Sequence, residues 1–149
     1  MNNNDILAGI AARIAGFEPP PHVKNLRFDV TLALDRFESG AVFCTWTPTE
    51  DFAIPGPGGF IFGGYVAAVT DAAAHFCMLT ILEDGQFYST ADLRVSYFRP
   101  FIERRYAVEA RLITRTRGQA HIEVSFLDAG DALAAMASLV QRLRAPPQT

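Results

Sequence analysis

The chain has 149 residues, 13 of them Lys or Arg and 16 Asp or Glu, with 50% apolar residues and a formal net charge of −3. This length suits one domain with a sizeable core, and the composition excludes a disordered chain, which needs low hydrophobicity and high charge. The mildly acidic balance argues against a nucleic-acid binder, which would carry a basic excess or a basic face. The two cysteines, Cys44 and Cys77, are too few for a disulfide framework and lack metal-ligand spacing, so we expect no metal site.

The N-terminal part predicts a helix, a linker and a hairpin. Residues 5–15 place apolar side chains at the spacing of one helix face, and the prolines at 19–21 predict a stiff linker. From 26 to 34, apolar and polar residues alternate, which is typical of a half-buried strand. A turn at 38–40 and a β-branched, aromatic segment at 41–47 complete the predicted hairpin.

A nearly uncharged run follows at 60–82, and Asp71 and His75 are its only groups that could be charged near pH 7. The run has about the ~20 residues that cross a bilayer. However, a charge at its centre costs roughly 2.5–3.5 kcal/mol, no basic cluster flanks it, and the N-terminus lacks the pattern of a signal peptide. We therefore expect no membrane association and a cytoplasmic protein.

The same run predicts a long helix. The Pro- and Gly-rich loop at 55–59 cannot extend a helix, so we place the helix from about Gly63 to Leu82, ended by Asp84-Gly85. Because the helix is apolar nearly all round, it must be surrounded by other elements.

Three strands with clear alternation come next, at 90–97, 105–115 and 119–126. In the first of them, the pattern places Thr90 on the face opposite to Tyr97. Hairpin-length turns at 117–118 and 128–131 connect the later strands.

The last segment, 132–143, suits a helix by propensity or a strand buried on both faces, and we favour the strand because a hairpin-like turn precedes it. The elements add up to a hairpin, one long helix and a four-strand meander. We predict an α+β fold in which one antiparallel sheet curls around a central helix. The whole chain, 1–149, forms one domain, with residues 1–21 as its N-terminal helix and Pro-rich linker.

Asp71 lies eight residues after Gly63, about 12 Å along the helix axis. A buried carboxylate needs a partner. The structural interpretation is that Asp71 reaches a surface gap or pairs with an arginine of the sheet. The functional interpretation is a general base or nucleophile at the edge of an apolar pocket.

The glycine pair at 63–64 adds a second feature. Glycines at a helix start leave backbone N–H groups unpaired and allow close approach, which suits an oxyanion or a polarised carbonyl. The plainer interpretation is a tight turn from loop to helix.

At this point the sequence resembles a known family. Residues 62–71, Phe-Gly-Gly-Tyr-Val-Ala-Ala-Val-Thr-Asp, resemble the His-Gly-Gly…Asp motif of hot-dog-fold thioesterases of the phenylacetate-degradation (PaaI-like) type. The segments 90–100 and 115–119 are similar to that family's strand after the helix and to its later hairpin turn. The resemblance covers roughly residues 25–143.

The resemblance implies a hot-dog fold and hydrolysis of acyl-CoA thioesters without a cofactor. Asp71 matches the catalytic carboxylate, Gly63 the glycine whose amide polarises the thioester carbonyl, and Thr90 falls near a hydroxyl residue that helps to place the water. Either water activated by Asp71 attacks the thioester, or Asp71 attacks directly to give a mixed anhydride. The family's sites lie at a dimer interface, so the resemblance also implies a homodimer, paired through the strand near 90–99, or a tetramer built as a dimer of dimers.

Two positions depart from the family pattern: Phe62 stands where His is usual, and Gly56 stands where many members carry Asn. The loop around Phe62 instead adds apolar surface, which suits a hydrophobic or aromatic acyl group. The alternative is a non-catalytic acyl-CoA or lipid-binding hot-dog protein, and a hot-dog hydratase ranks last.

Other residues complete the predicted site. His75 lies one turn after Asp71 on the same helix face, where it either orients the carboxylate and partly replaces the missing His, or is a hydrogen-bonded core residue. Arginines of the C-terminal half suit the phosphates of CoA, or form an ordinary solvated face. The predicted substrate-binding residues are Phe62, Gly64, Tyr65, His75, Arg99, Arg115 and Arg117.

Overall fold

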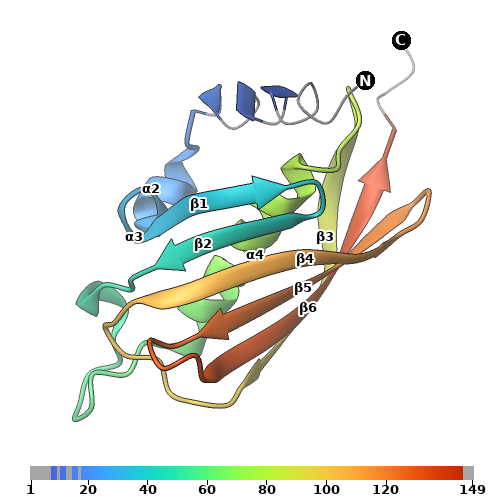
Figure 1. Ribbon diagram of the computed structural model, residues 1–149. Coiled ribbons are helices and arrows are strands. Elements are labelled where there is room, and N and C mark those ends of the chain that lie inside the picture. Colours follow the sequence, from blue (N-terminus) through green and yellow to red (C-terminus); the bar gives the residue numbers. More distant parts are fainter. Residues whose placement is uncertain (1–7, 10, 13–14, 17, 146–149) are drawn as a thin grey trace.

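One long helix lies against one six-stranded sheet in the computed structural model of the chain, which describes residues 8–9, 11–12, 15–16 and 18–145 (Figure 1). All neighbouring strands are antiparallel. The elements are α2 Pro21–Asn25, α3 Phe28–Thr31, β1 Leu32–Glu38, β2 Ala41–Trp46, the 3-10 turn η1 Glu50–Phe52, α4 Gly63–Leu79, β3 Phe87–Tyr97, β4 Tyr106–Arg115, β5 Gln119–Leu127 and β6 Leu133–Arg144. The predicted α+β fold, a curled sheet around a central helix, is confirmed, and so is the strand at the C-terminal end.

The strand order differs from the predicted meander. The sheet runs β1-β2-β4-β5-β6-β3, so β3 crosses to the far edge and pairs with β6, while β4 pairs with β2. The chain leaving β3 stays tied to β6, because the N–H groups of Phe98 and Arg99 both donate to the Ala134 carbonyl. The segment 98–105 contains no tight turn that would make β3 and β4 neighbours. Consequently β3 has an edge that pairs with no described strand.

The predicted strand at 26–34 is wrong over residues 26–31. Arg27 adopts a left-handed conformation, with φ 58°, and the one-turn helix α3 follows it. The Thr31 hydroxyl donates to the Arg27 carbonyl at 2.7 Å, and Phe28 is buried. The helical turn buries Phe28 and Thr31, three residues apart, and leaves Val30 exposed, so the alternation does not hold there and β1 begins only at Leu32.

Most of the predicted N-terminal helix lies outside the described residues. Within 5–15, only 8–9, 11–12 and 15 are described, and they are helical. The prolines at 19–21, predicted as a linker, lead directly into α2, which starts at Pro21; proline suits the first turn of a helix, where its missing N–H would have no partner.

Helix α4 ends three residues before the predicted Leu82. Thr80 caps it: the Thr80 hydroxyl donates to the Cys77 carbonyl at 2.7 Å and accepts the Gly40 N–H at 2.8 Å. Gly40 is the turn of the β1–β2 hairpin, where a φ of +80° favours glycine. One buried hydroxyl therefore joins the end of the helix to the hairpin turn.

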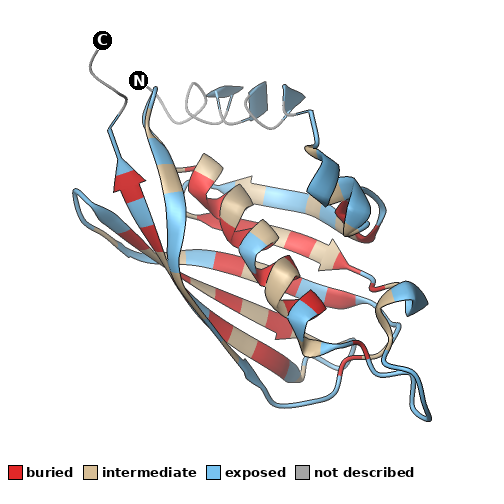
Figure 2. Ribbon diagram, turned by 180° about the vertical axis from the view of Figure 1, so that it is seen from behind, coloured by how far each residue is buried: buried red, intermediate tan, exposed pale blue. Residues whose placement is uncertain are grey.

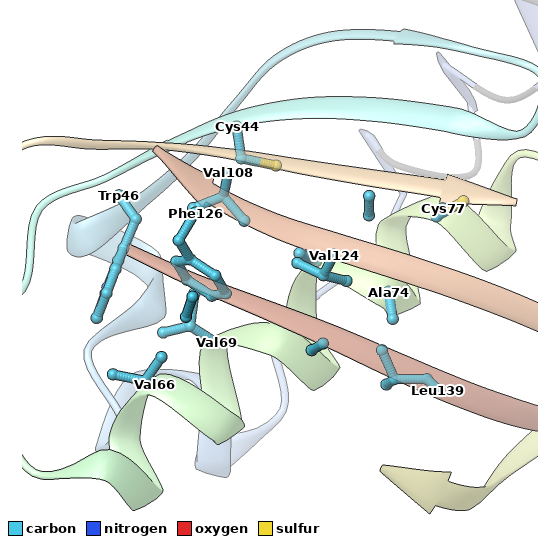
Figure 3. Packing of buried hydrophobic residues seen from close by; sticks show 14 of the residues in the cluster. Cys44, Trp46, Val66, Val69, Ala74, Cys77, Val108, Val124, Phe126 and Leu139 are labelled. Carbon is cyan, nitrogen blue, oxygen red and sulfur yellow. The ribbon is translucent and has the colours of Figure 1, made fainter. Parts of the chain in front are cut away.

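The core lies between α4 and the inner face of the sheet (Figure 3). Trp46 is fully buried, with the rings of Tyr65, Phe101, Tyr106 and Phe126 at 5.6–5.8 Å between centroids. The alternating apolar residues of β5 are all buried: Ala120, Ile122, Val124 and Phe126. Cys44 and Cys77 are free thiols in this core, and burial raises the pKa of each to about 12.

The sheet covers only one side of α4. Residues on the opposite side are exposed or half-buried and form one stripe along the helix (Figure 2). The members of this open stripe are Gly64, Ala67, Ala68, Asp71, Ala72 and His75. Among the helices that the structure describes, none is long and apolar enough to cross a membrane.

The Thr80 hydroxyl predicts a stability effect. Thr80→Val keeps the shape of the side chain but leaves the Gly40 N–H and the Cys77 carbonyl without this partner, so we expect a loss of about 1–3 kcal/mol in the free energy of unfolding. Urea unfolding at fixed protein concentration measures it. Thr114→Val, at an exposed position of β4, is the matched control and should change stability by less than about 0.5 kcal/mol. Equal effects of the two substitutions would contradict the role of Thr80.

Candidate active site

The start of α4 presents unpaired backbone donors. Phe62 is the N-cap residue and its side chain makes no capping hydrogen bond. The Tyr65 N–H donates to the Phe62 carbonyl at 3.1 Å, whereas the N–H groups of Gly63 and Gly64 donate to none of the described residues. Two adjacent amides with the positive end of the helix dipole are thus available to an anion or a polarised oxygen.

Two aromatic rings lie close to these glycines. A Cβ atom on Gly63 would lie 3.3 Å from the Tyr97 ring, and one on Gly64 would lie 2.7 Å from the Phe62 ring. The Tyr97 hydroxyl donates to the Gly63 carbonyl. The helix start is therefore covered by rings from β3 and from the preceding loop: a side chain at 64 would displace the Phe62 ring, whereas a Cβ at 63 requires the Tyr97 ring to give way by only a few tenths of an ångström.

Asp71 has one neutral partner. The Thr90 hydroxyl donates to Asp71 Oδ1 at 2.8 Å, and the Asp71 side chain lies on the open stripe of α4. Of the two options in the structural interpretation, the surface position of Asp71 is observed, whereas no arginine pairs with its carboxylate among the described residues.

A β-bulge brings Thr90 to this position. The β3–β6 register shifts between Thr90 and Asp92, so Ala91 is the extra residue and the alternation of faces reverses there. Thr90 and Tyr97, predicted on opposite faces, both contact α4. The predicted face of Thr90 is wrong, and the error is one residue of register.

His75 lies one turn beyond Asp71, as predicted, and it contacts β3: His75 Nδ1 and the Tyr88 hydroxyl form a short hydrogen bond. Burial lowers the pKa of His75, the Asp71 carboxylate acts in the opposite direction, and His22 adds to the lowering. Burial and the charge of Asp71 both raise the pKa of Tyr88. Tyr88, Thr90, Asp71 and His75 thus form one polar group across β3 and α4.

An apolar pocket of about 440 Å³ opens beside Gly63. The rings of Phe60, Tyr97, Phe98 and Phe101 are among its walls, and Arg99 stands at it as the one charged lining residue. Phe98 is 58% exposed. An apolar group bound here would cover rings that water now contacts.

The other two predicted arginines lie at the opposite end of α4. Arg115 donates to the Ile81 carbonyl at 2.6 Å and to the side chains of Glu83 and Gln86 at 3.0 Å each. With Arg117 it lines a separate pocket of about 620 Å³. Arg115 therefore holds the chain after the helix, and the structure does not bring this pair to the pocket beside Gly63.

Tyr65 faces the core. Its side chain is fully buried, its hydroxyl donates to the Leu26 carbonyl at 2.8 Å, and its ring stacks on Phe52 at 3.8 Å between centroids. Phe62, 41% exposed, stacks in turn on the outer side of Phe52 and Tyr65. Tyr65 supports the helix start from beneath, and Phe62 is the ring that a ligand can touch.

The sequence did not single out Tyr88 or Tyr97 as site residues. Tyr88 is two residues before Thr90 on one strand, so the period-2 rule could have placed both on one face. The signal for Tyr97 was weaker, because only the register of β3 brings it over Gly63. Within the described ranges, no three His, Cys, Asp or Glu side chains gather closely enough to hold a metal ion.

Comparisons with known proteins relate the chain to a known family. A family model described as the thioesterase superfamily matches residues 58–135, which include the loop, α4 and β3. No curated protein matches the chain in sequence.

Similar solved structures extend beyond that segment. One is a putative thioesterase of Ralstonia eutropha described as phenylacetic acid degradation-related, with 23% identity, TM-score 0.75, and 90% of this chain and 98% of that one covered. The E. coli PaaI protein from the phenylacetic acid degradation operon has 12% identity, TM-score 0.76, and coverage of 97% and 96%. A Streptococcus mutans protein bound to acetyl-CoA has 16% identity, TM-score 0.68, and coverage of 78% and 91%. At these identities the likeness concerns the fold.

The polar group around Asp71 predicts how His75 titrates. We expect a His75 pKa below 6.5, because burial disfavours the imidazolium. Asp71→Asn should lower it further, because the carboxylate that favours the charged ring is lost. NMR titration of the imidazole nitrogens measures both values, with Asp29→Asn, an exposed acid on α3, as the control. A His75 pKa that does not move in Asp71→Asn would contradict the geometry.

Proposed function

The chain belongs to the thioesterase superfamily, and we propose that it hydrolyses acyl-CoA thioesters whose acyl group is hydrophobic or aromatic. Family membership makes it a thioesterase; the acyl group and the roles of single residues are the proposal. The observation that carries the proposal is the Asp71 carboxylate, held by Thr90, on the open stripe of α4 that begins at Gly64, beside the unpaired amides of the helix start.

The spacing of these groups supports a site shared by two copies of the chain. Gly63 and Asp71 are eight residues apart on one helix, about 12 Å along its axis. A general base acts within about 2.6–3.2 Å or through one water. One chain therefore cannot bring both groups to the same thioester carbonyl.

Two copies related by a two-fold axis can. If their α4 helices run antiparallel with open stripes facing, the crossing point falls near Ala67, midway between Gly63 and Asp71. Gly63 of each copy then lies near Asp71 of the other copy, which makes two equivalent sites. The alanines of the stripe let the helices approach closely, and the unpaired edge of β3 is available to the second copy. A tetramer made from two such dimers is the alternative assembly.

The proposed reaction follows from these groups. The thioester oxygen accepts the Gly63 N–H, and Asp71 takes a proton from water as that water attacks the carbonyl carbon. When the tetrahedral intermediate collapses, the C–S bond breaks, the departing CoA sulfur takes the proton from Asp71, and the carboxylic acid is released. In the second route, an Asp71 oxygen attacks the carbonyl carbon and the CoA thiolate leaves. Water then hydrolyses the mixed anhydride, which restores the Asp71 carboxylate, releases the acid and supplies the proton of the thiol.

The surroundings suit this substrate. The apolar pocket beside Gly63 is large enough for an aromatic or short aliphatic acyl group. Arg99 stands at that pocket and suits a CoA phosphate, whereas Arg115 and Arg117 would meet the nucleotide only from the far end of α4. We keep the cytoplasm, where acyl-CoA is made and used, as the proposed compartment.

A second candidate function rests on two residues. Phe62 and Gly56 stand where the resembling family has His and Asn, and neither side chain can hydrogen-bond a carbonyl or a water. A protein that binds acyl-CoA without hydrolysing it would keep the pocket and dispense with these polar groups.

Asp71→Asn separates the two functions. We expect kcat for CoA release to fall about 10²–10⁴-fold, the contribution of a general base, with substrate binding retained. Free-thiol detection on a panel from acetyl-CoA to benzoyl-CoA measures it, and Asp29→Asn is the control that should stay active. If the wild type releases no more CoA than Asp71→Asn on any substrate, the non-catalytic function is correct.

Mixed dimers test the shared site. Gly63→Pro removes the N–H and suits the first helical position, because Phe62 already has the extended φ and ψ (−69°, 142°) that a following proline requires. Gly63→Ala adds a Cβ but keeps the N–H, and serves as its control. A dimer with Asp71→Asn on one copy and Gly63→Pro on the other should retain about half the wild-type kcat, through one intact site.

The reciprocal dimer has both substitutions on one copy and none on the other, and it should be inactive. Two affinity tags allow each mixed dimer to be purified. If the reciprocal dimer is the active one, each site lies within a single chain and the shared site is wrong.

A further inference from the structure

Tyr97, the last residue of β3, contacts the helix start through both its ring and its hydroxyl. The hydroxyl donates to the Gly63 carbonyl, and the side chain lies over Gly63, with the ring atom Cζ and the hydroxyl oxygen each 3.3 Å from the position a Gly63 Cβ would take. The same ring is a wall of the apolar pocket. No other described side chain both lines that pocket and hydrogen-bonds the helix start.

The Gly63 carbonyl belongs to the same peptide unit as the Gly64 N–H. A hydrogen bond accepted by a peptide oxygen polarises the unit and makes its N–H a stronger donor. The Gly64 N–H donates to none of the described residues, whereas the next amide along, that of Tyr65, is already used by the Phe62 carbonyl. Tyr97 therefore acts on the last unpaired donor of the helix start.

We propose that Tyr97 is a positioning residue that fixes and polarises the Gly63–Gly64 peptide, so that the Gly64 N–H serves beside that of Gly63 as a second donor to the thioester oxygen. This inference rests on the proposed hydrolysis and adds the Gly64 amide and Tyr97 to it. It gives the site a second donor where the family His is replaced by Phe62.

The state of the hydroxyl agrees with this role. Burial raises the pKa of Tyr97 above its ordinary value, so the phenol stays protonated and donates throughout the neutral range. Tyr97 is 46% exposed and lines the pocket. An acyl group in the pocket therefore touches the residue that holds the peptide.

A purely structural Tyr97 would pack over Gly63 with no effect on the donor. The packing role and the positioning role are therefore distinguished by a substitution that removes the hydroxyl and keeps the ring. Tyr97→Phe keeps the ring and removes the hydrogen bond, and Ser96→Ala removes an exposed hydroxyl from the neighbouring residue of β3 as the matched control.

For the proposed role we expect kcat on benzoyl-CoA to fall about three- to tenfold in Tyr97→Phe, the loss of one hydrogen bond felt in the transition state. KM should stay unchanged, and Ser96→Ala should equal the wild type. Site-specific fluorotyrosines at position 97, which make the phenol a stronger donor with little change in size, should raise kcat in order of their acidity at a pH where each remains protonated.

A measurement without turnover accompanies the kinetics. The amide ¹⁵N resonance of Gly64 should move upfield in Tyr97→Phe. In the wild type, the Gly64 amide proton should respond to the ketone analogue of benzoyl-CoA, in which CH₂ replaces sulfur. That response should weaken in Tyr97→Phe.

The results separate two failures. An active wild type whose kcat is unchanged in Tyr97→Phe, or whose kcat ignores the acidity of the fluorotyrosines, would overturn this inference and leave the proposed hydrolysis intact. A wild type that releases no CoA would overturn the hydrolysis. In that case a Gly64 amide that does not respond to the analogue would overturn the second donor as well.

Discussion

Helix α4 is apolar nearly all round, yet the sheet covers only one of its sides, and this constraint organises the rest of the structure. The covered side packs against Trp46 and the aromatic residues around it. This packing fixes the rotation of the helix about its own axis and its distance from the sheet. The uncovered side must then carry small residues and the one carboxylate, Asp71. An open apolar stripe is costly in water, so the same constraint that positions the acid also favours a second copy as its cover.

The sequence predicted what depends on local pattern and missed what depends on register. The curled sheet, the start of α4 at Gly63 and the turns of the later hairpins follow from periodicity and from glycine, and all are observed. The face of Thr90 could not be predicted, because the bulge at Ala91 is a property of the β3–β6 pairing and leaves no mark in the composition. Tyr97 could not be predicted for the same reason, since only the register of β3 brings it over Gly63, whereas Tyr88 shares the face of Thr90 and follows once that face is known.

The aromatic residues at the helix start change how this site can be understood. The resemblance expects a polar His before the glycines, and here Phe62 stacks on Tyr65 and covers Gly64 instead. The side-chain hydrogen bond at the helix start comes from Tyr97 of β3, whose hydroxyl donates to the Gly63 carbonyl. In the proposed function, the apolar rings exclude water from the path of the acyl group, and the donors are backbone N–H groups, which substitution of a side chain cannot easily remove.

The bulge at Ala91 has a consequence for a pair of chains. Because it turns both halves of β3 toward α4, one strand supports Asp71 through Thr90 near its start and Gly63 through Tyr97 at its end. In the proposed dimer these two groups belong to different reaction centres. Each β3 strand then spans both centres, and a disturbance of one strand, such as a ligand that displaces Tyr97, is transmitted along it to the acid of the neighbouring centre. The two centres would share a rigid mechanical element and not merely a common surface.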